Sequence, residues 1–200
     1  MNVLHLMLLD AGGGDAEASA AVEHAEVCGA TQARLLHKVF GDFGSGARLL
    51  ICEFTSRSDL VRYAERPLGL VASIRHVIVA SQLPIEGGES EIRGSVLELD
   101  IAQVNPGRWR DAMSAAQNGL TFFLAAGALN CRLWHLDIAG SYSRTIAWLV
   151  EYEDLAAWGE RRDAAVRDPK VLEGAKLMHD VSPPAERIST DVFREIDFVR

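Results

Sequence analysis

The alternation of hydrophobic and polar residues predicts the order strand, helix, strand, strand, helix, strand, and it does so twice. A first apolar run, Val3-Leu4-His5-Leu6, is matched later in the chain by Val96-Leu97-Glu98-Leu99. Glycine or proline follows each run, and apolar residues then recur at helical spacing over about 15–28 and 108–126. Two β-rich runs joined by glycine-containing turns come next in each half, at 33–41 with 48–55 and at 131–139 with 144–152.

A second helix and a last strand complete each half. The helices are expected to start near Asp59 and Asp154, and the strands are expected over 75–82 and 187–196. Glycine, glutamate and serine replace the apolar pattern between the halves. We therefore expect one unit over 1–85, a linker over 86–92 and a second unit over 93–200.

The two halves also share residues. The segment 29–37 and the segment 127–135 both read GAxxxRLxH, an offset of 127 − 29 = 98 residues. Without a gap the same offset aligns seven identical positions over 26 residues, namely Gly29, Ala30, Arg34, Leu35, His37, Ser45 and Glu53 with their counterparts. Ordinary composition gives roughly two by chance. The pattern predicts a tandem repeat of one βαββαβ unit.

A βαββαβ unit covers one face of its sheet with its two helices and leaves the other face bare. That bare face is too apolar here for water, and two units can bury it by facing each other. The sequence therefore predicts an α+β fold: two tandem ferredoxin-like units packed sheet to sheet as an intramolecular pseudo-dimeric α+β barrel.

Composition narrows the function classes. The formal charge of −8 leaves no excess of lysine and arginine for a phosphate backbone, so nucleic acid is not an expected partner. Cys28, Cys52 and Cys131 have no CxxC spacing, which is typical of small apolar residues in a reducing compartment. No apolar stretch is long enough to cross a bilayer, and the start lacks the basic region of a signal peptide. We expect a cytoplasmic protein with no membrane partner.

Short motifs carry a family resemblance. They are Val104-Asn105-Pro106-Gly107-Arg108, a later Gly-Ala before a strand, and a Glu-Tyr strand end before a helix. With the topology, they resemble the dimeric α+β barrel superfamily in a fused form, and are similar to its NIPSNAP-like and antibiotic-biosynthesis-monooxygenase-like members. The resemblance implies a small-molecule site. Its members include cofactor-independent oxygenases, isomerases, haem-binding enzymes and proteins without known activity, and fold alone does not choose among them.

The repeated arginine and glutamate have a structural and a chemical interpretation. A hairpin tip at Phe43-Gly44 places Arg34 opposite Glu53, and the equivalent register places Arg132 opposite Glu151. Cross-strand ion pairs of this kind contribute about 0.2–1 kcal/mol each. The alternative is that Arg132 and Glu151 contact a substrate carboxylate or transfer a proton.

His135 is the candidate catalytic residue, as a general base or an axial metal ligand. The same register places Trp148 and Tyr152 on its face, where the first unit has His37 among aliphatic residues. Apolar walls with few polar groups are typical of small-molecule sites. The structural alternative is a core histidine among core aromatics. Which face lines the inter-sheet space is left open, so Trp134, Arg132 and Glu151 are candidate ligand contacts as well.

The histidines show no zinc spacing, and no phosphate-loop or GxSxG motif is present. No cofactor is expected, with haem as an alternative. The sequence thus predicts a small-molecule-binding barrel, with cofactor-independent monooxygenase or isomerase chemistry as its enzymatic form. A non-catalytic interaction module and a haem-binding protein are the alternatives. A fused barrel needs no partner, but its sheet edges could form a homodimer.

Overall fold

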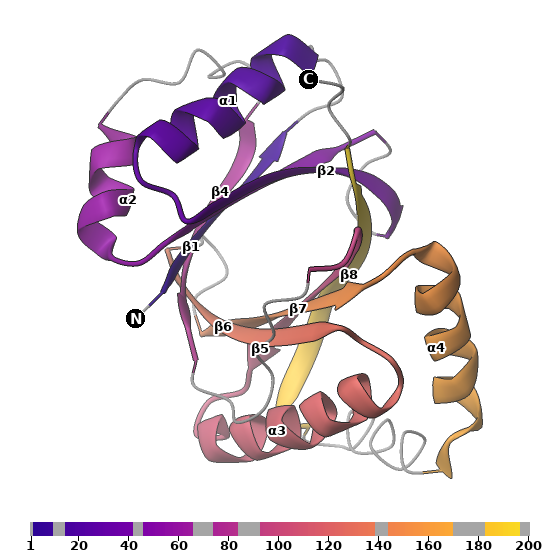
Figure 1. The fold of residues 1–200 in the computed structure, drawn as a ribbon. Helices are drawn as coiled ribbons and strands as arrows, with labels where there is room; N and C mark the ends of the chain where they lie inside the picture. Colours follow the sequence, from indigo (N-terminus) through magenta and orange to yellow (C-terminus); the bar gives the residue numbers. More distant parts are fainter. Residues whose placement is uncertain are drawn as a thin grey trace. The chain divides into compact units, whose positions relative to one another are not determined.

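The computed structural model describes residues 2–9, 15–41, 46–65, 74–83, 93–138, 144–169 and 183–196. Over these residues the chain forms eight β-strands and four α-helices, an α+β fold (Figure 1). By its contacts the chain divides into two compact units. Unit one comprises Met1–Gln82, His135–Ser143 and Asp191–Arg200, and unit two comprises Leu83–Trp134 and Arg144–Thr190.

Unit one is built on an antiparallel sheet in the order β4-β1-β3-β2. Its elements are β1 (Val3–Leu9), α1 (Asp15–Val27), β2 (Gln32–Gly41), β3 (Arg48–Phe54), α2 (Arg57–Ala64) and β4 (Ile74–Gln82). The last residues of β8 (Ala185–Glu195) pair with β2, from Leu36 opposite Glu195 to Gly41 opposite Asp191. This strand order and element order are those of a ferredoxin-like unit.

Both helices of unit one cover the same side of its sheet (Figure 1). Ala21 and Ala25 of α1 and Leu60 and Tyr63 of α2 pack there against alternate strand residues, which are Val3, Met7, Leu9, Leu35, Leu50, Cys52, Phe54 and Val79. The intervening residues of the same strands are buried as well, including Leu4, Leu36 and Ile51. Both faces of β1 and β3 are therefore buried, which explains why these two strands show near-continuous apolar runs rather than alternation.

Unit two repeats the order of elements. They are β5 (Val96–Val104), α3 (Trp109–Ala125), β6 (Asn130–Ile138), β7 (Thr145–Tyr152), α4 (Leu155–Arg167) and β8, and the strand order is β8-β5-β7-β6. β5 pairs with β7 from Val96 opposite Tyr152 to Gln103 opposite Thr145. Ala112 and Ala116 of α3 pack against Val104, Leu133 and Ile146 of the sheet.

The predicted strands and helices are confirmed within one to three residues at nearly every boundary. α2 starts two residues before the expected position because the Ser56 side chain accepts a hydrogen bond from the backbone N–H of Asp59. Asp154 caps α4 in the same way, through the N–H of Ala157. The expected hairpin tip at Phe43-Gly44 and the expected linker at 86–92 lie outside the described residues.

The first helix of each unit ends in the same backbone motif. Gly29 and Gly127 have φ values of +95° and +93°. The N–H groups of Ala30 and Ala128 each donate to a carbonyl five residues back, at 3.0 Å in both units. These bonds form a Schellman motif, in which glycine adopts the left-handed conformation without a steric penalty.

The predicted register of the first hairpin was wrong by two residues. Glu53 lies opposite Gln32, and Arg34 lies opposite Ile51, so Arg34 does not face Glu53. The observed register sets Leu35 against Leu50 and Leu36 against Leu49, all of them buried. Because side chains alternate with a period of two, the shift keeps every residue on its predicted face and changes only its partner.

Candidate functional site

The seven predicted site residues lie on three strands: His37 on β2, Arg132, Trp134 and His135 on β6, and Trp148, Glu151 and Tyr152 on β7. Leu133 contacts the core beneath α3, on the face that it shares with Cys131 and His135. Arg132 and Trp134 point the other way, and the Arg132 guanidinium carbon lies 5.6 Å from the centre of the Trp134 ring. The fold therefore separates these seven candidate side chains into several environments.

Glu151 is fully buried at the centre of a polar cluster in unit two. Its Oε1 accepts hydrogen bonds from Asn130 at 3.1 Å and from Arg132 at 3.2 Å. Its Oε2 accepts from the backbone N–H of Gly94 at 3.1 Å, and Arg93 lies 3.7 Å from Oε1. The ion pair of Arg132 with Glu151 is thus present, as predicted. Both carboxylate oxygens are engaged with the chain itself, which favours the structural interpretation of this pair.

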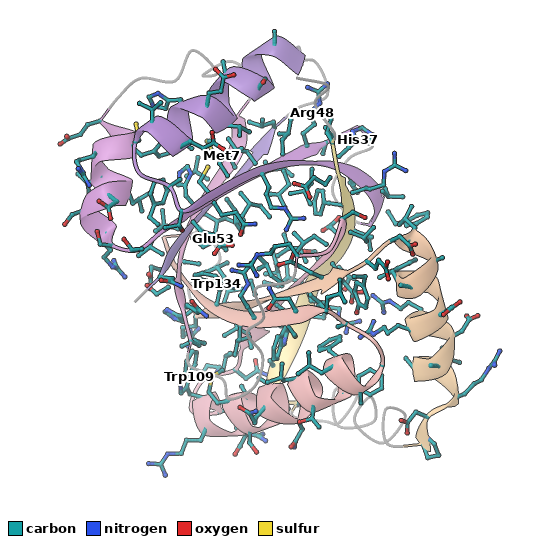
Figure 2. The ribbon with its side chains drawn as sticks, viewed as in Figure 1. Met7, His37, Arg48, Glu53, Trp109 and Trp134 are labelled. Carbon is teal, nitrogen blue, oxygen red and sulfur yellow. The ribbon has the colours of Figure 1, made fainter. Side chains whose placement is uncertain are left out.

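Trp134, labelled in Figure 2, is on β6. It is fully buried, and Arg132 lies over its ring. Its ring and the guanidinium form a cation–π contact, and such contacts gain strength when they are desolvated. Trp134 and Arg132 thus lie together on the face of β6 opposite to Leu133.

Trp148 and Tyr152 lie on the helix-covered face of unit two. The Trp148 ring is 5.8 Å from that of Phe123 on α3, and Trp148 is half-buried. Tyr152 is fully buried, and its hydroxyl has no hydrogen-bond partner among the described residues. Burial raises the pKa of Tyr152, and the negative charge of Glu98 raises it further. Tyr152 therefore stays a neutral phenol.

A second buried polar cluster lies next to Tyr152, and we call it the Glu98 cluster. It consists of Glu98, Trp158, Arg161 and Arg162, none of which was predicted as a site residue. The Glu98 side chain is 0 % exposed. It accepts hydrogen bonds from Trp158 Nε1 at 2.7 Å, Arg162 at 2.9 Å and Arg161 at 3.4 Å. Burial raises the pKa of Glu98 and so does neighbouring Asp100, while Arg161 and Arg162 oppose this shift. The sequence signal was a charged residue within an apolar strand.

His135 belongs to a different cluster, which we call the Asp137 cluster: Arg57, Ser81, His135 and Asp137, all within unit one. His135 Nδ1 lies 3.1 Å from Asp137 Oδ1. The other carboxylate oxygen of Asp137 binds Arg57 at 2.6 Å and the Ser81 hydroxyl. His135 is 35 % exposed and Arg57 is 61 % exposed, so solvent reaches both of their side chains.

This geometry orients the imidazole. With the proton on Nδ1 shared with Asp137, the neutral ring presents Nε2 as its basic nitrogen. Arg57 and Ser81 hold the carboxylate from the other side, which fixes its position. His135 and Asp137 thus have the arrangement of a general base with its orienting carboxylate.

His37, the counterpart of His135 in the repeat, is exposed in the middle of β2 (Figure 2). Val39 stands where unit two has Asp137, since 137 − 98 = 39. His37 therefore lacks the orienting carboxylate two residues along its strand. Among the described residues, no three histidine, cysteine, aspartate or glutamate side chains gather as a metal site. No described helix is long and apolar enough to span a membrane.

No protein-family model matches the sequence, and the search of curated proteins found no match. Solved structures do share the fold. An anthrone oxidase-like protein matches with a TM-score of 0.66 and 15% identity, covering 98% of this chain and 92% of that one. A ferredoxin-fold protein from Listeria monocytogenes, related to antibiotic biosynthesis monooxygenases, matches with a TM-score of 0.57 and 12% identity over 99% and 97%.

A haem-degrading enzyme from Listeria monocytogenes matches with a TM-score of 0.54 and 11% identity, over 94% of this chain and 98% of that one. At these identities the likeness is one of fold. The chain has the ferredoxin-like fold of proteins related to antibiotic biosynthesis monooxygenases, which confirms the fold implied by the sequence motifs at this level.

Proposed function

We propose that the protein binds a small molecule and removes a proton from it, with His135 as the general base. The observation that carries this proposal is the Asp137 cluster, in which one carboxylate orients His135 and also holds Arg57. A base oriented in this way and open to solvent can act on a ligand, whereas a core histidine cannot.

The neighbouring groups suit this role. A neutral His135 accepts the proton at Nε2, and Asp137 then stabilises the imidazolium that forms. The exposed Arg57 guanidinium supplies a positive charge beside it, which favours an acidic or enolisable ligand that becomes an anion. Ser81 donates to Asp137 and keeps the carboxylate in place.

Two reaction types fit a site of this kind. An isomerase returns the proton to another atom of the substrate, and a cofactor-independent monooxygenase delivers the resulting carbanion to dioxygen. Both begin with removal of a proton from an activated carbon or a phenol. The anthrone oxidase-like and monooxygenase-related neighbours share the fold, which supports this class of chemistry as a proposal.

The test is deuterium exchange into anthrone and into a small 1,3-diketone, followed by NMR in D2O. The protein is expected to accelerate exchange of the acidic C–H over buffer. His135→Gln should abolish the acceleration, and Asp137→Asn should reduce it about 100-fold or more. His37→Gln is the matched comparison, because it removes a histidine from the same motif position without an aspartate partner. Equal rates for the protein and His135→Gln would rule out the proposed base.

The other predicted ligand contacts lie in unit two or away from the Asp137 cluster. Trp148 and Tyr152 belong to the helix-covered face, while Trp134, Arg132 and Glu151 are engaged with one another and with the backbone. Their roles as ligand contacts, and that of His37, stay predictions. We propose a structural role for Arg132 and Glu151.

We also propose that the two units are tandem copies of one ancestor, of NIPSNAP-like type. Equal backbone hydrogen bonds support this: Thr31 N–H donates to Glu53 O and Leu129 N–H to Glu151 O, both at 2.8 Å. Both donors and acceptors are related by the offset of 98 residues. Sheet-to-sheet packing of the copies, a homodimer and a cytoplasmic location stay predictions.

Haem is the alternative cofactor, since one structural neighbour is a haem-degrading enzyme. A carboxylate on Nδ1 is the usual support of a metal-binding histidine. However, His135 belongs to a polar cluster, in which Asp137 contacts its Nδ1 and Arg57 and Ser81 bind Asp137, and such polar groups do not fit the apolar faces of a macrocycle. We therefore derive no step through haem. Titration with haem should give no Soret band that depends on His135.

A further inference from the structure

The helices of this protein are held to their sheets in different ways. α3 buries Ala112, Ala116, Leu120 and Phe123, and α2 buries Leu60 and Tyr63. Of the thirteen residues of α4, Arg161 is the only one that is buried. A helix gains most of its stability from an apolar face packed on the core, and the apolar side chains of α4, such as Leu155, Trp158 and Ala165, are only half-buried. The contacts of Arg161 and its neighbours are therefore important for holding α4 to the sheet.

That attachment is the Glu98 cluster. Three side chains of α4, namely Trp158, Arg161 and Arg162, converge on the single carboxylate of Glu98 on β5. The Arg161 guanidinium carbon also lies 4.4 Å from the centre of the Phe123 ring and 5.9 Å from that of Tyr152. α4 thus contacts the sheet through a buried ionic cluster, reinforced by cation–π contacts.

The hydrogen bonds within the Glu98 cluster are incomplete. Arg161 approaches Glu98 through one terminal nitrogen at 3.4–3.5 Å, not in the bidentate geometry that makes such pairs strong. The Nε atoms of Arg161 and Arg162 are buried and have no hydrogen-bond partner among the described residues. Both would gain hydration if α4 moved away.

The charges around Glu98 also favour movement of α4 away from the sheet. The charged groups facing Glu98 are Asp100 on its own strand and Arg161 and Arg162 on α4. Burial and Asp100 raise the pKa of Glu98 despite the two arginines, so its ionised form is held beneath α4 at a cost. Opening of α4 would return the carboxylate to water, which offsets part of the contact energy that is lost.

The helix covers groups that can react or bind. The Tyr152 hydroxyl is buried and lacks a partner among the described residues. Cys131 is 0 % exposed on the helix-facing side of β6, within the electrostatic reach of Arg161 and Glu98. We propose that α4 is a lid, held shut by the Glu98 cluster, whose opening gives small solutes access to Tyr152 and Cys131 in unit two. The proposal is independent of the role of His135.

Hydrogen exchange on the intact protein at pH 7 tests the lid. The amides of α4 are expected to exchange by local opening, faster than those of α3, β5 and β7. Glu98→Gln should raise the exchange rate of α4 by roughly tenfold or more, because it leaves Arg161 buried without a counter-charge, and it should leave α3 unchanged. Glu160→Gln is the matched control, since it removes the same charge from an exposed position on α4.

Two further variants keep the test decisive if Glu98→Gln fails to fold. Trp158→Phe removes one hydrogen bond to Glu98 and keeps both arginine pairs, so α4 should exchange moderately faster. The double variant Glu98→Gln with Arg161→Met replaces the ion pair by a neutral, apolar anchor on Phe123 and should return α4 exchange to the original rate or below. A return to the original exchange rate in the double variant is expected only if the Glu98–Arg161 pair sets the equilibrium between the closed and open positions of α4.

Thiol labelling gives an independent readout. In a Cys28→Ser, Cys52→Ser background, Cys131 should be modified by a small methanethiosulfonate faster in Glu98→Gln than in Glu160→Gln. The proposal is overturned if α4, α3 and β5 exchange at one common rate in every variant. It is also overturned if Cys131 is labelled only as fast as the whole unit unfolds.

Discussion

Arg132 and Glu151 lie 3.2 Å apart across β6 and β7, both of them buried. Arg34, which has the position of Arg132 in the repeat, binds Glu195 of β8, at 2.9 and 3.2 Å. The arginine of the repeated motif thus forms an ion pair in both units, with Glu151 of β7 in unit two and with Glu195 of β8 in unit one.

Glu151→Gln should destabilise the protein by about 3 kcal/mol, because it leaves Arg132 buried without its counter-charge and weakens the bonds from Asn130 and Gly94. Urea denaturation followed by circular dichroism measures the loss. Glu153→Gln, two residues further on and exposed, serves as the control and should change stability by less than about 0.5 kcal/mol. Equal losses of unfolding free energy in Glu151→Gln and Glu153→Gln would contradict a structural role for Glu151.

Glycine substitutions should act in opposite directions at two sites in unit two. A Cβ at Gly94 would lie 2.0 Å from the backbone oxygen of Tyr152, so Gly94→Ala must displace a strand and should cost about 3 kcal/mol or more. A Cβ at Gly159, within α4, meets nothing within 4 Å. Gly159→Ala should stabilise the protein by about 0.5–1 kcal/mol through helix propensity. Thermal unfolding of the two variants checks both signs.

Gly29 and Gly127 should respond alike if the units are copies. Each has a positive φ and open space around its Cβ position, so strain is the main effect of Gly29→Ala and of Gly127→Ala. We expect a loss of about 1 kcal/mol for each and additive losses in the double variant, measured by urea denaturation. A loss at one site only would argue against equivalent helix ends.

Much of the fold could be predicted from the sequence, because glycine, proline and apolar runs mark element ends strongly. The repeat of GAxxxRLxH located the helix end and the following strand in both units. The hairpin register could not be predicted, since the sequence between β2 and β3 leaves the number of loop residues open and a shift by two preserves every face. The bond between Arg34 and Glu195 could not be predicted either, because it joins residues 161 positions apart and no local pattern indicates it.

The candidate site was predictable in part. His135 was identified from the repeat, but its partners Ser81 and Arg57 come from β4 and α2, distant in sequence. Asp137 could have been found, because residues two apart on a strand share a face. Glu98 was missed since a lone charge in an apolar strand has no local signal of its partners on α4. Tertiary contacts between elements decide such pairings.

His5 should make the protein sensitive to acid. It is the unit-one counterpart of Glu98 at the offset of 93 residues, and its ring packs edge-on against Tyr63 at 5.3 Å. Its Nδ1 is buried without a hydrogen-bond partner among the described residues, and burial lowers the pKa of His5 from 6.5 to about 4. The folded state therefore resists protonation, while the unfolded chain takes up a proton near pH 6.5.

The stability that depends on neutral His5 is fully present above pH 6.5 and is lost as the pH falls from 6.5 to about 4. The two pKa values correspond to about 3 kcal/mol of unfolding free energy across this range. His5→Leu, of similar volume, removes the titration and should flatten this part of the pH profile without lowering stability at pH 7. Urea denaturation at half-unit pH steps measures both proteins. Parallel profiles for the two would show that other groups cause the acid loss and that His5 is not its source.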